Sequence, residues 1–431
     1  MKNDVRHFDY VYPPLRQELA EAVSRSYLFD MEDRDVMCYQ NGYILPAKYI
    51  DGYNAVGGCM DANGSFIWDC AVPDFMGYPY EFETVDAEVE DVCIYVGYMY
   101  NCYGHMIGDC LRWAWFAQTR KCKDLLHKGA KFVCISIDKL ASYQIELLKL
   151  AGIDNVVCIE RPTQVKHLYI PHPSIITKDG QNYYSACFDD TINLMIHNAY
   201  AICHKSFYDK VYLTRSRWKK GDVSNERQIE RFFSCKGYKI ISPERMSIAE
   251  QIVLLNNASS VAATECSLSH QMIFCQPMAE CYILRKNLHI NKYSLFINQM
   301  RQLKVIYIDC SLSLLVPNDA WWSGPFFIYL NDNLSRCFEE GFSTHTQLRL
   351  PKKEFAKYLM LSFFETSNIA HRLKNVSPIY ADLLQNEISR CPKNSLKSRL
   401  RKCRIFSKIY KRMKSDAKSR ISSHINCNPR L

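Results

Sequence analysis

Apolar runs alternate with helical patterns along two stretches of the chain, and this alternation restricts the fold more than any other feature. The first stretch has apolar runs at 92–98, 131–137 and 155–160, separated by the patterns LRWAWFAQTR and ASYQIELLKLAG. The second has the strand patterns KVYLT, YKIIS, SSVAA and ECYILR, separated by SNERQIERFFSCKG, SIAEQIVLLNNA and a short helix from Ser267. Such alternation predicts parallel sheets covered by helices.

Two successive series of this type, without internal sequence repetition, predict an α/β fold of two Rossmann-like domains that face each other across a cleft. A chain of 431 residues, 48% of them apolar, can bury two cores. We expect an N-terminal α/β domain with a β-rich start at 1–190 and a second domain at 191–345. C-terminal helices at 346–392 and a basic amphipathic tail at 393–431 are expected to follow.

Two segments of the first domain depart from the alternation. Residues 40–100 mix short apolar and aromatic runs with Gly, Asn and Asp, which is typical of short strands and turns. Residues 172–190 are rich in Pro, Ser, Asp and Tyr, and we expect them to connect the two domains.

The tail carries a net charge of +12 over residues 393–431, whereas residues 1–392 carry −3 and the whole chain +9. A mildly acidic body argues against binding to nucleic acid. Apolar residues recur in the tail at three- or four-residue spacing, as in an amphipathic helix: Leu396, Leu400, Cys403, Phe406, Tyr410 and Met413. We expect the tail to bind an anionic membrane surface, the alternative being a disordered solvated tail or a non-specific nucleic-acid patch.

Targeting and metal-binding patterns are weak in this sequence. Residues 1–15 mix charges and prolines where a signal peptide has its apolar run, so we expect a cytoplasmic protein. The 20 cysteines are scattered, and we expect most of them to be reduced core residues. Cys102-x-x-His105 has no second pair nearby, so no structural zinc is expected. The triplet Asp33-Arg34-Asp35 lies far from the other motifs and is expected to be a solvated loop or helix start.

The first group of candidate site residues follows the run at 92–98, in the segment NCYGHMIGDCLRW. His105 and Asp109 are four residues apart, which places them on one helical face near the carboxyl end of a strand. In doubly wound sheets that end faces the ligand. The pattern alone fits equally a catalytic pair and a histidine hydrogen-bonded in a packed core.

A second group lies around residues 214–227, where a strand ends in basic residues and a helix begins. Arg215 beside unbonded backbone N–H groups suits a diphosphate. The alternative is a solvated basic loop, in which Ser224 caps the helix and Glu226 lies in its first turn.

A third group begins with Ser247 and Glu250, whose spacing is that of a capping box and indicates a structural role. After the strand pattern SSVAA, the small and hydroxylated residues 263–269 form a turn into a helix. We expect the N-terminus of that helix at Ser267 to bind a phosphate or nucleotide, with His270 one turn inside.

These motifs, in this order, resemble glycosyltransferase family 61. The similar segments are Y-G-H-x-x-x-D-x-L-x-R-x-W, T-R-S, N-E and S-L-S-H-Q-M-I-F, and the resemblance spans about residues 90 to 335. Bacterial members have a similar G-H-F-x-x-D-x-L-x-R-x-W segment and a later G-T-x-x-H-N. Two residues depart from the family pattern: Cys266 stands where glycine is usual, and Gln271 where asparagine is usual.

The resemblance implies an inverting hexosyl- or pentosyltransferase of the GT-B kind. It implies a first domain on the acceptor side and a second domain that binds a nucleotide sugar. The expected donor is UDP-linked, and no other cofactor or metal is expected. The acceptor is expected to be a glycan or lipid-linked glycan in capsular or cell-surface polysaccharide synthesis, at the inner face of the cell membrane.

Roles carry over to individual residues by the same resemblance. His105 is the expected general base, with Asp109 as its orienting partner or as the alternative base. The donor side is assigned to five residues: Arg215, Asn225, Glu226, Ser267 and His270.

Two other functions stay open. Gly108-Asp109-Cys110-Leu111 resembles the G-D-S-L signature of a hydrolase family, with Cys110 as the nucleophile. No D-x-x-H follows in the place where that family has one. The other alternative is a sugar-binding homologue without turnover, which the departure at Cys266 makes conceivable.

Overall fold

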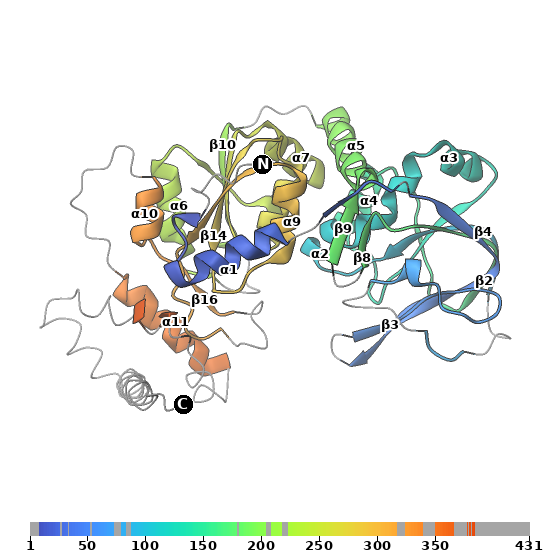
Figure 1. The fold of residues 1–431 in the computed structure, drawn as a ribbon, viewed down its shortest axis with the longest axis horizontal. Coiled ribbons are helices and arrows are strands. Elements are labelled where there is room, and N and C mark those ends of the chain that lie inside the picture. Colours follow the sequence, from blue (N-terminus) through green and yellow to red (C-terminus); the bar gives the residue numbers. More distant parts are fainter. Residues whose placement is uncertain are drawn as a thin grey trace, which may run out of the picture.

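The computed structural model describes residues 8–25, 28–32, 34–51, 54–72, 79–82, 88–178, 181–203, 208–217, 223–316, 324–338 and 350–365, together with 377, 379–380 and 382–383. These residues form two lobes that lie side by side, with α5 (Ala186–Ile202) where they meet (Figure 1). The tail expected at 393–431 lies outside the described residues. Within them, no helix is both long enough and apolar enough to cross a membrane.

The first lobe is built on a mixed sheet of six described strands, in the order β3-β2-β7-β4-β5-β6. Its central strand β4 pairs in parallel with β5 and β7, whereas β2 pairs antiparallel with β7 and β3. The strands are β2 (Val36–Asp51), β3 (Asn54–Met60), β4 (Glu88–Tyr98), β5 (Lys131–Ile135), β6 (Val157–Cys158) and β7 (Thr163–Pro171). The expected parallel units at β4, β5 and β6 are confirmed, and the antiparallel edge is added to them.

The short strands and turns expected within residues 40–100 are partly wrong. Residues 36–51 form the single 16-residue strand β2, whose register with β3 shifts between Leu45 and Lys48. Pro46 lies inside this shift, where a bulge removes the need for a ladder hydrogen bond from its nitrogen. The proline therefore bends a long strand instead of ending a short one.

Helices of the first lobe follow its strands. They are α2 (Tyr103–Gly108), η4 (Cys110–Gln118), α3 (Arg120–His127) and α4 (Ser142–Leu150), where η marks a 3-10 helix. The expected helix LRWAWFAQTR is the 3-10 helix η4, and its residues Cys110 through Ala117 are all buried. A helix that is buried on every side has no face toward solvent, and it is therefore largely apolar all round instead of amphipathic.

The connection expected at 172–190 is wrong. Its residues form the hairpin of β8 (Ile175–Lys178) and β9 (Gln181–Ser185) and then enter α5, so the boundary expected after residue 190 falls inside a helix. A short strand, β1 (Leu28–Asp30), pairs in parallel with β9. Proline, serine and tyrosine are as compatible with an edge hairpin as with a linker.

The second lobe has a five-stranded sheet in which every described pair is parallel, in the order β12-β10-β13-β14-β15. The strands are β10 (Lys210–Leu213), β12 (Lys239–Ile241), β13 (Ser260–Thr264), β14 (Glu280–Arg285) and β15 (Lys304–Asp309). The helices between them are α6 (Glu226–Cys235), α7 (Ile248–Asn257), α8 (Ser267–His270), η6 (Gln271–Phe274) and α9 (Lys292–Met300). The expected second α/β series is confirmed.

The strand order of this sheet reverses between β10 and β13, because the chain leaves β10 toward β12 and then returns to the other side of β10. In open α/β sheets a ligand binds outside the carboxyl ends of the strands at such a reversal. The segments after β10 and β13 therefore lie where the topology favours binding.

Both ends of the described chain pack on the second lobe. The helix α1 (Pro13–Ser24) lies across it (Figure 1), and the backbone N–H of Tyr12 donates to Asp309 Oδ2 at 2.6 Å. Toward the C-terminus, β11 (Val223–Ser224) pairs in parallel with β16 (Phe326–Phe327). Residues 332–337 form α10 (Asp332–Cys337), and α11 (Lys352–Glu365) lies in the segment 346–392, where residues 379–380 and 382–383 are also helical.

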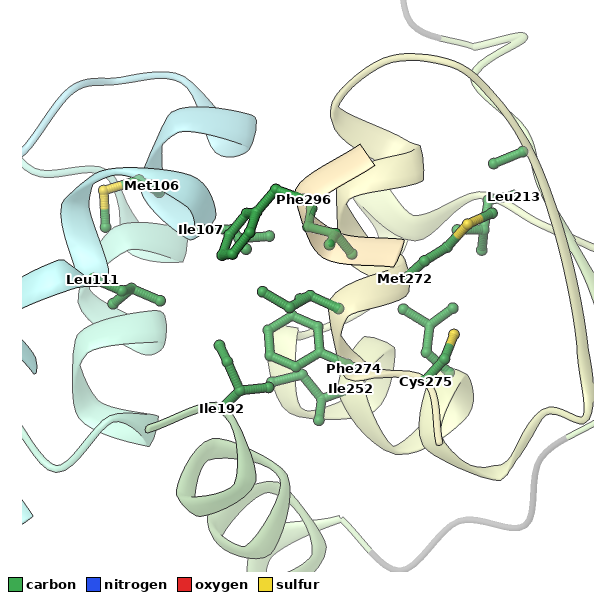
Figure 2. Packing of buried hydrophobic residues seen from close by; sticks show 14 of the residues in the cluster. Met106, Ile107, Leu111, Ile192, Leu213, Ile252, Met272, Phe274, Cys275 and Phe296 are labelled. Carbon is green, nitrogen blue, oxygen red and sulfur yellow. The ribbon is translucent and has the colours of Figure 1, made fainter. Parts of the chain in front are cut away.

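One hydrophobic cluster runs through both lobes. Figure 2 shows side chains of α2 and η4 facing side chains of α5, η6 and α9 across the junction, among them Met106, Ile107, Leu111, Ile192, Phe274 and Phe296. A fully buried apolar side chain of this size contributes about 1.5 to 3 kcal/mol. The cluster therefore holds α2 firmly against the second lobe. The cysteines among the described residues are free thiols, and most of them are buried.

Candidate active site

His105 and Asp109 form a hydrogen-bonded pair at the junction of the lobes. His105 lies in the middle of α2 and Asp109 directly after it, and 2.8 Å separates His105 Nδ1 from Asp109 Oδ2. The side chain of His105 is 26% exposed, and that of Asp109 only 5%. The structure thus brings the predicted pair together, with the histidine on the accessible side.

Three side chains surround the carboxylate of Asp109. Besides the bond to His105, Arg112 Nη2 lies 2.7 Å from Oδ1, and the hydroxyl of Tyr293 donates to both carboxylate oxygens, at 2.6 Å to Oδ1. Burial by itself raises the pKa of Asp109, but the hydrogen bond with His105 and the charge of Arg112 outweigh burial and lower it. Asp109 is therefore a carboxylate at neutral pH.

A carboxylate on Nδ1 determines the tautomer of a neutral histidine. The proton lies on Nδ1, where Asp109 accepts it, so the lone pair is on Nε2. The rings of Tyr100 and Tyr293 meet the His105 ring edge to face, with centroids 5.3 and 5.8 Å away. This arrangement presents Nε2 as a base held in one orientation.

The segment after β10 places Arg215 beside Glu226, the first residue of α6. The backbone N–H of Arg215 donates to Glu226 Oε1 at 3.0 Å, and the hydroxyl of Tyr212 donates to the same atom at 3.2 Å. Burial raises the pKa of Glu226 to about 7. Its other oxygen, Oε2, has no hydrogen-bond partner among the described residues.

Asn225 has a backbone role in the structure. It adopts the left-handed conformation with φ of 71°, and its Nδ2 donates to the backbone oxygen of Ile328 at 2.9 Å. It also precedes α6, so the expectation that Ser224 caps this helix is wrong: Ser224 ends β11 instead. The capping box of Ser247 and Glu250 is confirmed by reciprocal hydrogen bonds.

The turn after β13 carries Cys266, Ser267 and His270. Cys266 has extended backbone angles, φ −175° and ψ −161°, which any residue can adopt, so its place in a glycine position causes no backbone strain. Its thiol accepts from the N–H of Leu268 at 3.5 Å. The helix α8 that begins at Ser267 is only four residues long, so its dipole is weaker than the sequence suggested.

His270 is 7% exposed and neutral. Burial, together with the neighbouring His105, lowers the pKa of His270 to about 4. The amide Nδ2 of Asn291 lies 3.2 Å from Nε2. Because that amide nitrogen only donates, Nε2 accepts and the proton of His270 lies on Nδ1. Nδ1 is buried without a hydrogen-bond partner among the described residues.

Two glycines of α2, Gly104 and Gly108, pack against side chains of the second lobe. A Cβ added to Gly104 would lie 2.7 Å from His270 Nδ1 and 3.0 Å from Ser267 Oγ, and one added to Gly108 would lie 2.9 Å from the Tyr293 ring. Residues at these positions have no room for a side chain. The helix α2, which carries His105, is thus in direct contact with the segment after β13 and with α9.

Sequence reasoning missed Lys286, which follows β14. Its side chain is buried, and its Nζ lies 4.1 Å above the ring of Phe326. Burial lowers the pKa of Lys286, and the charge of Arg215 lowers it further. Arg215 and Lys286 thus follow the carboxyl ends of β10 and β14, on either side of β13 in the same sheet. The available signal was Lys286 directly after Arg285, the last residue of the strand pattern ECYILR.

Sequence reasoning also missed a buried network of charged side chains at the carboxyl ends of β13, β14 and β15. Arg285 Nη1 lies 2.9 Å from Asp309 Oδ1 and its Nε 3.9 Å from Glu265 Oε2. Burial raises the pKa of Glu265 to about 7. Because Asp309 also accepts from the backbone of Tyr12, this network joins the start of the chain to the ends of β14 and β15.

Cys110 lies in the hydrophobic core. It is 1% exposed, and burial raises the pKa of its thiol to about 12. A thiol of this kind has almost no thiolate at neutral pH and no access to a substrate. The structure therefore gives no support to the hydrolase alternative. Among the described residues, no group of three or more His, Cys, Asp or Glu side chains is arranged to hold a metal ion.

Comparisons with known proteins bear on this site. Residues 103–282 match the family described as Glycosyltransferase 61, a range that includes the dyad and the segments after β10 and β13. No curated protein matches significantly. The chain is similar to the bacterial iron-containing dodecameric glycosyltransferase TibC from enterotoxigenic E. coli H10407, with 12% identity over 83% of this chain and 95% of that chain, and a TM-score of 0.23. A TM-score this low carries no argument about the arrangement of the lobes.

Proposed function

We propose that the protein transfers a sugar from a nucleotide-sugar donor to a hydroxyl group of a glycan or lipid-linked glycan, with inversion at the anomeric carbon. The match of residues 103–282 to the glycosyltransferase 61 family supports sugar transfer. The observation that carries this proposal is the pair of His105 and Asp109, in which a buried carboxylate orients a partly exposed imidazole. Direct displacement needs one such base.

The proposed reaction has one chemical step. Nε2 of His105 takes the proton of the acceptor hydroxyl. At the same time the oxygen of that hydroxyl attacks the anomeric carbon of the donor. The bond between that carbon and the phosphate oxygen breaks, and its electron pair leaves with the nucleoside diphosphate. Asp109 stabilises the imidazolium through Nδ1, as a buried carboxylate does in other acid–base pairs.

Charge on the leaving diphosphate requires positive partners. Arg215 and Lys286 lie at the carboxyl ends of β10 and β14, beside the topological reversal where ligands bind in sheets of this kind. In a largely buried site two cations stabilise a developing phosphate charge more strongly than in water. His270 is neutral, so in this proposal it contributes hydrogen bonding through Nδ1 and not charge, with Ser267 next to it.

Several features of the proposal go beyond the domain itself. We propose a UDP-linked hexose or pentose as donor, a GT-B-like use of the two lobes, and a place in bacterial capsular or cell-surface polysaccharide synthesis. We further propose that the protein works in the cytoplasm at the inner membrane face, held there by residues 393–431, whose charge is +12. These features rest on the resemblance of the motifs and on the charge of the tail. The dyad, Arg215 and Lys286 require no metal ion in this scheme.

A panel of nucleotide sugars tests the proposal. A donor that binds the native state raises the melting temperature of the protein, and a working transferase releases the nucleoside diphosphate slowly even without acceptor. We expect at least one donor to give both effects. Binding without any release, with or without a glycan acceptor, would favour the sugar-binding alternative. If no nucleotide sugar in the panel binds and none releases its nucleoside diphosphate, the proposed function is contradicted.

A further inference from the structure

Tyr293 contacts the pair of His105 and Asp109 from far along the chain. It lies in the first turn of α9, on the second lobe, yet its hydroxyl donates to Asp109, 184 residues away. The other partners of this carboxylate, His105 and Arg112, are local neighbours on the first lobe. The dyad therefore has one anchor on each lobe.

The glycines of α2 allow this contact. Gly108 packs against the Tyr293 ring and Gly104 against the His270 ring, at distances that leave no space for a Cβ. The Tyr293 ring also lies between two histidines, with its centroid 5.8 Å from that of His105 and 5.7 Å from that of His270. The ring is thus fixed by packing, and its hydroxyl is directed at Asp109.

The first turn of α9 is bonded to the turn after β13. Asn291 caps α9 by accepting from the N–H of Ser294 at 3.2 Å, and its amide donates to His270. The hydroxyls of Ser269 and Ser294 lie 3.1 Å apart. A displacement of α8 would therefore move α9 and with it the hydroxyl on Asp109.

From these contacts we propose that Tyr293 is a positioning residue: its hydroxyl, supplied by the donor-binding lobe, holds Asp109 and through it aligns the His105 ring, so that the base is aligned only while α9 lies against α2. The proposal rests on the proposed function for the role of His105. Tyr293 itself does not touch the reacting atoms.

The argument against a purely structural role is chemical. Arg112 already neutralises one oxygen of Asp109 from within the same lobe, and the apolar cluster already joins the lobes. What the hydroxyl adds is a hydrogen bond that favours the ionised carboxylate and limits its rotation. Loss of this bond should affect the base more than the fold or the donor.

The substitution Tyr293→Phe tests the proposal in the full-length protein, because it keeps the ring on Gly108 and removes only the hydroxyl. Tyr103→Phe is the matched control: Tyr103 also lies at the lobe junction, and its hydroxyl donates to Gln251 Oε1 at 3.5 Å, away from the dyad. The measurements are kcat and KM for the donor found in the nucleotide-sugar panel, the pH dependence of kcat, and the NMR signal of the His105 Nδ1 proton, assigned by comparison with His105→Asn.

We expect Tyr293→Phe to lower kcat roughly 10-fold, the equivalent of one hydrogen bond to a charged group, and to leave KM for the donor within about twofold. The acid limb of kcat should move to higher pH, because Asp109 loses a donor to its ionised form. The Nδ1 proton signal should broaden because it exchanges faster with water. Tyr103→Phe should change none of these.

A Tyr293→Phe variant with the kcat and pH profile of the wild type would overturn the proposal, and so would an unchanged Nδ1 proton signal. The NMR measurement needs no substrate. If no nucleotide sugar is turned over by the wild type, the proposed function fails while the positioning of His105 by Tyr293 is still decided by the NMR signal.

Discussion

At the scale of single residues, the local pair was predictable and its distant partners were not. His105 and Asp109 are one helical turn apart, so spacing alone placed them together. Tyr293 and Lys286 reach the site through tertiary packing, and a contact across 184 residues leaves no periodic signal. The sequence also suggested an effect that the structure does not have. Cys266 departs from the family pattern, yet it fits without strain because its backbone is extended.

Glu226 gives a prediction about stability and pH. Burial raises its pKa from 4.5 to about 7, so the folded state keeps a proton that the unfolded chain loses. This stabilisation is complete below about pH 4.5 and is lost as the pH rises toward 7. We expect Glu226→Gln to remove the effect, so that the free energy of unfolding of the variant, relative to wild type, rises by roughly 1 to 3 kcal/mol between pH 5 and pH 8.

Urea unfolding at the two pH values measures this difference. Glu244→Gln is the control, because Glu244 is exposed and should show the same difference from wild type at both pH values. A Glu226→Gln variant whose difference from wild type is also independent of pH would contradict the effect of burial on Glu226.

At the scale of elements, the strands and helices of the second lobe were largely predictable because each strand is a short apolar run before a polar turn. The strands β10, β12 and β14 fall within predicted runs, and β13 extends one residue beyond SSVAA, to Thr264. The segment 172–190 was not predictable, since its turn residues suit a linker and the hairpin of β8 and β9 equally. The order of strands, and so the reversal between β10 and β13, came only from the structure.

That reversal leads to a prediction for the residues that follow β10 and β14. Arg215→Ala should weaken the binding of the nucleoside diphosphate by roughly 1.5 to 3 kcal/mol, through loss of a charge-assisted contact. Lys286→Met should act in the same direction, because it keeps an unbranched side chain beside Phe326 and removes the charge that lies over the ring. Calorimetric titration measures both affinities.

The control is Arg231→Ala, which removes an exposed cation from α6. Arg231→Ala should bind the nucleoside diphosphate as the wild type does. Unchanged affinity in both Arg215→Ala and Lys286→Met would place the phosphate site elsewhere.

At the scale of the whole molecule, the sequence predicted two α/β series but not how they join. The lobes share one hydrophobic cluster, and the N-terminal helix α1 lies on the second lobe instead of the first. Neither feature has a local pattern, because α1 is bonded to Asp309, almost 300 residues later. The facing of two domains across a cleft stays a prediction.

The membrane role proposed for the tail belongs to this scale, because it would place the whole molecule. If residues 393–431 form a basic amphipathic helix, the full chain should sediment with anionic liposomes at low salt and release at high salt. A truncation that ends at Cys391 should stay in solution. Equal sedimentation of the two forms, or no preference for anionic over neutral liposomes, would remove the membrane role from the tail.

The central claim is that His105 is the base of a sugar transfer, and His105→Ala measures it most directly. With the donor found in the panel, we expect transfer to fall by about 100-fold to 10,000-fold while donor affinity and the melting temperature stay near those of the wild type. His127→Ala, an exposed histidine at the end of α3, should keep wild-type transfer. A folded His105→Ala variant with normal transfer would contradict the account and move the base to another residue.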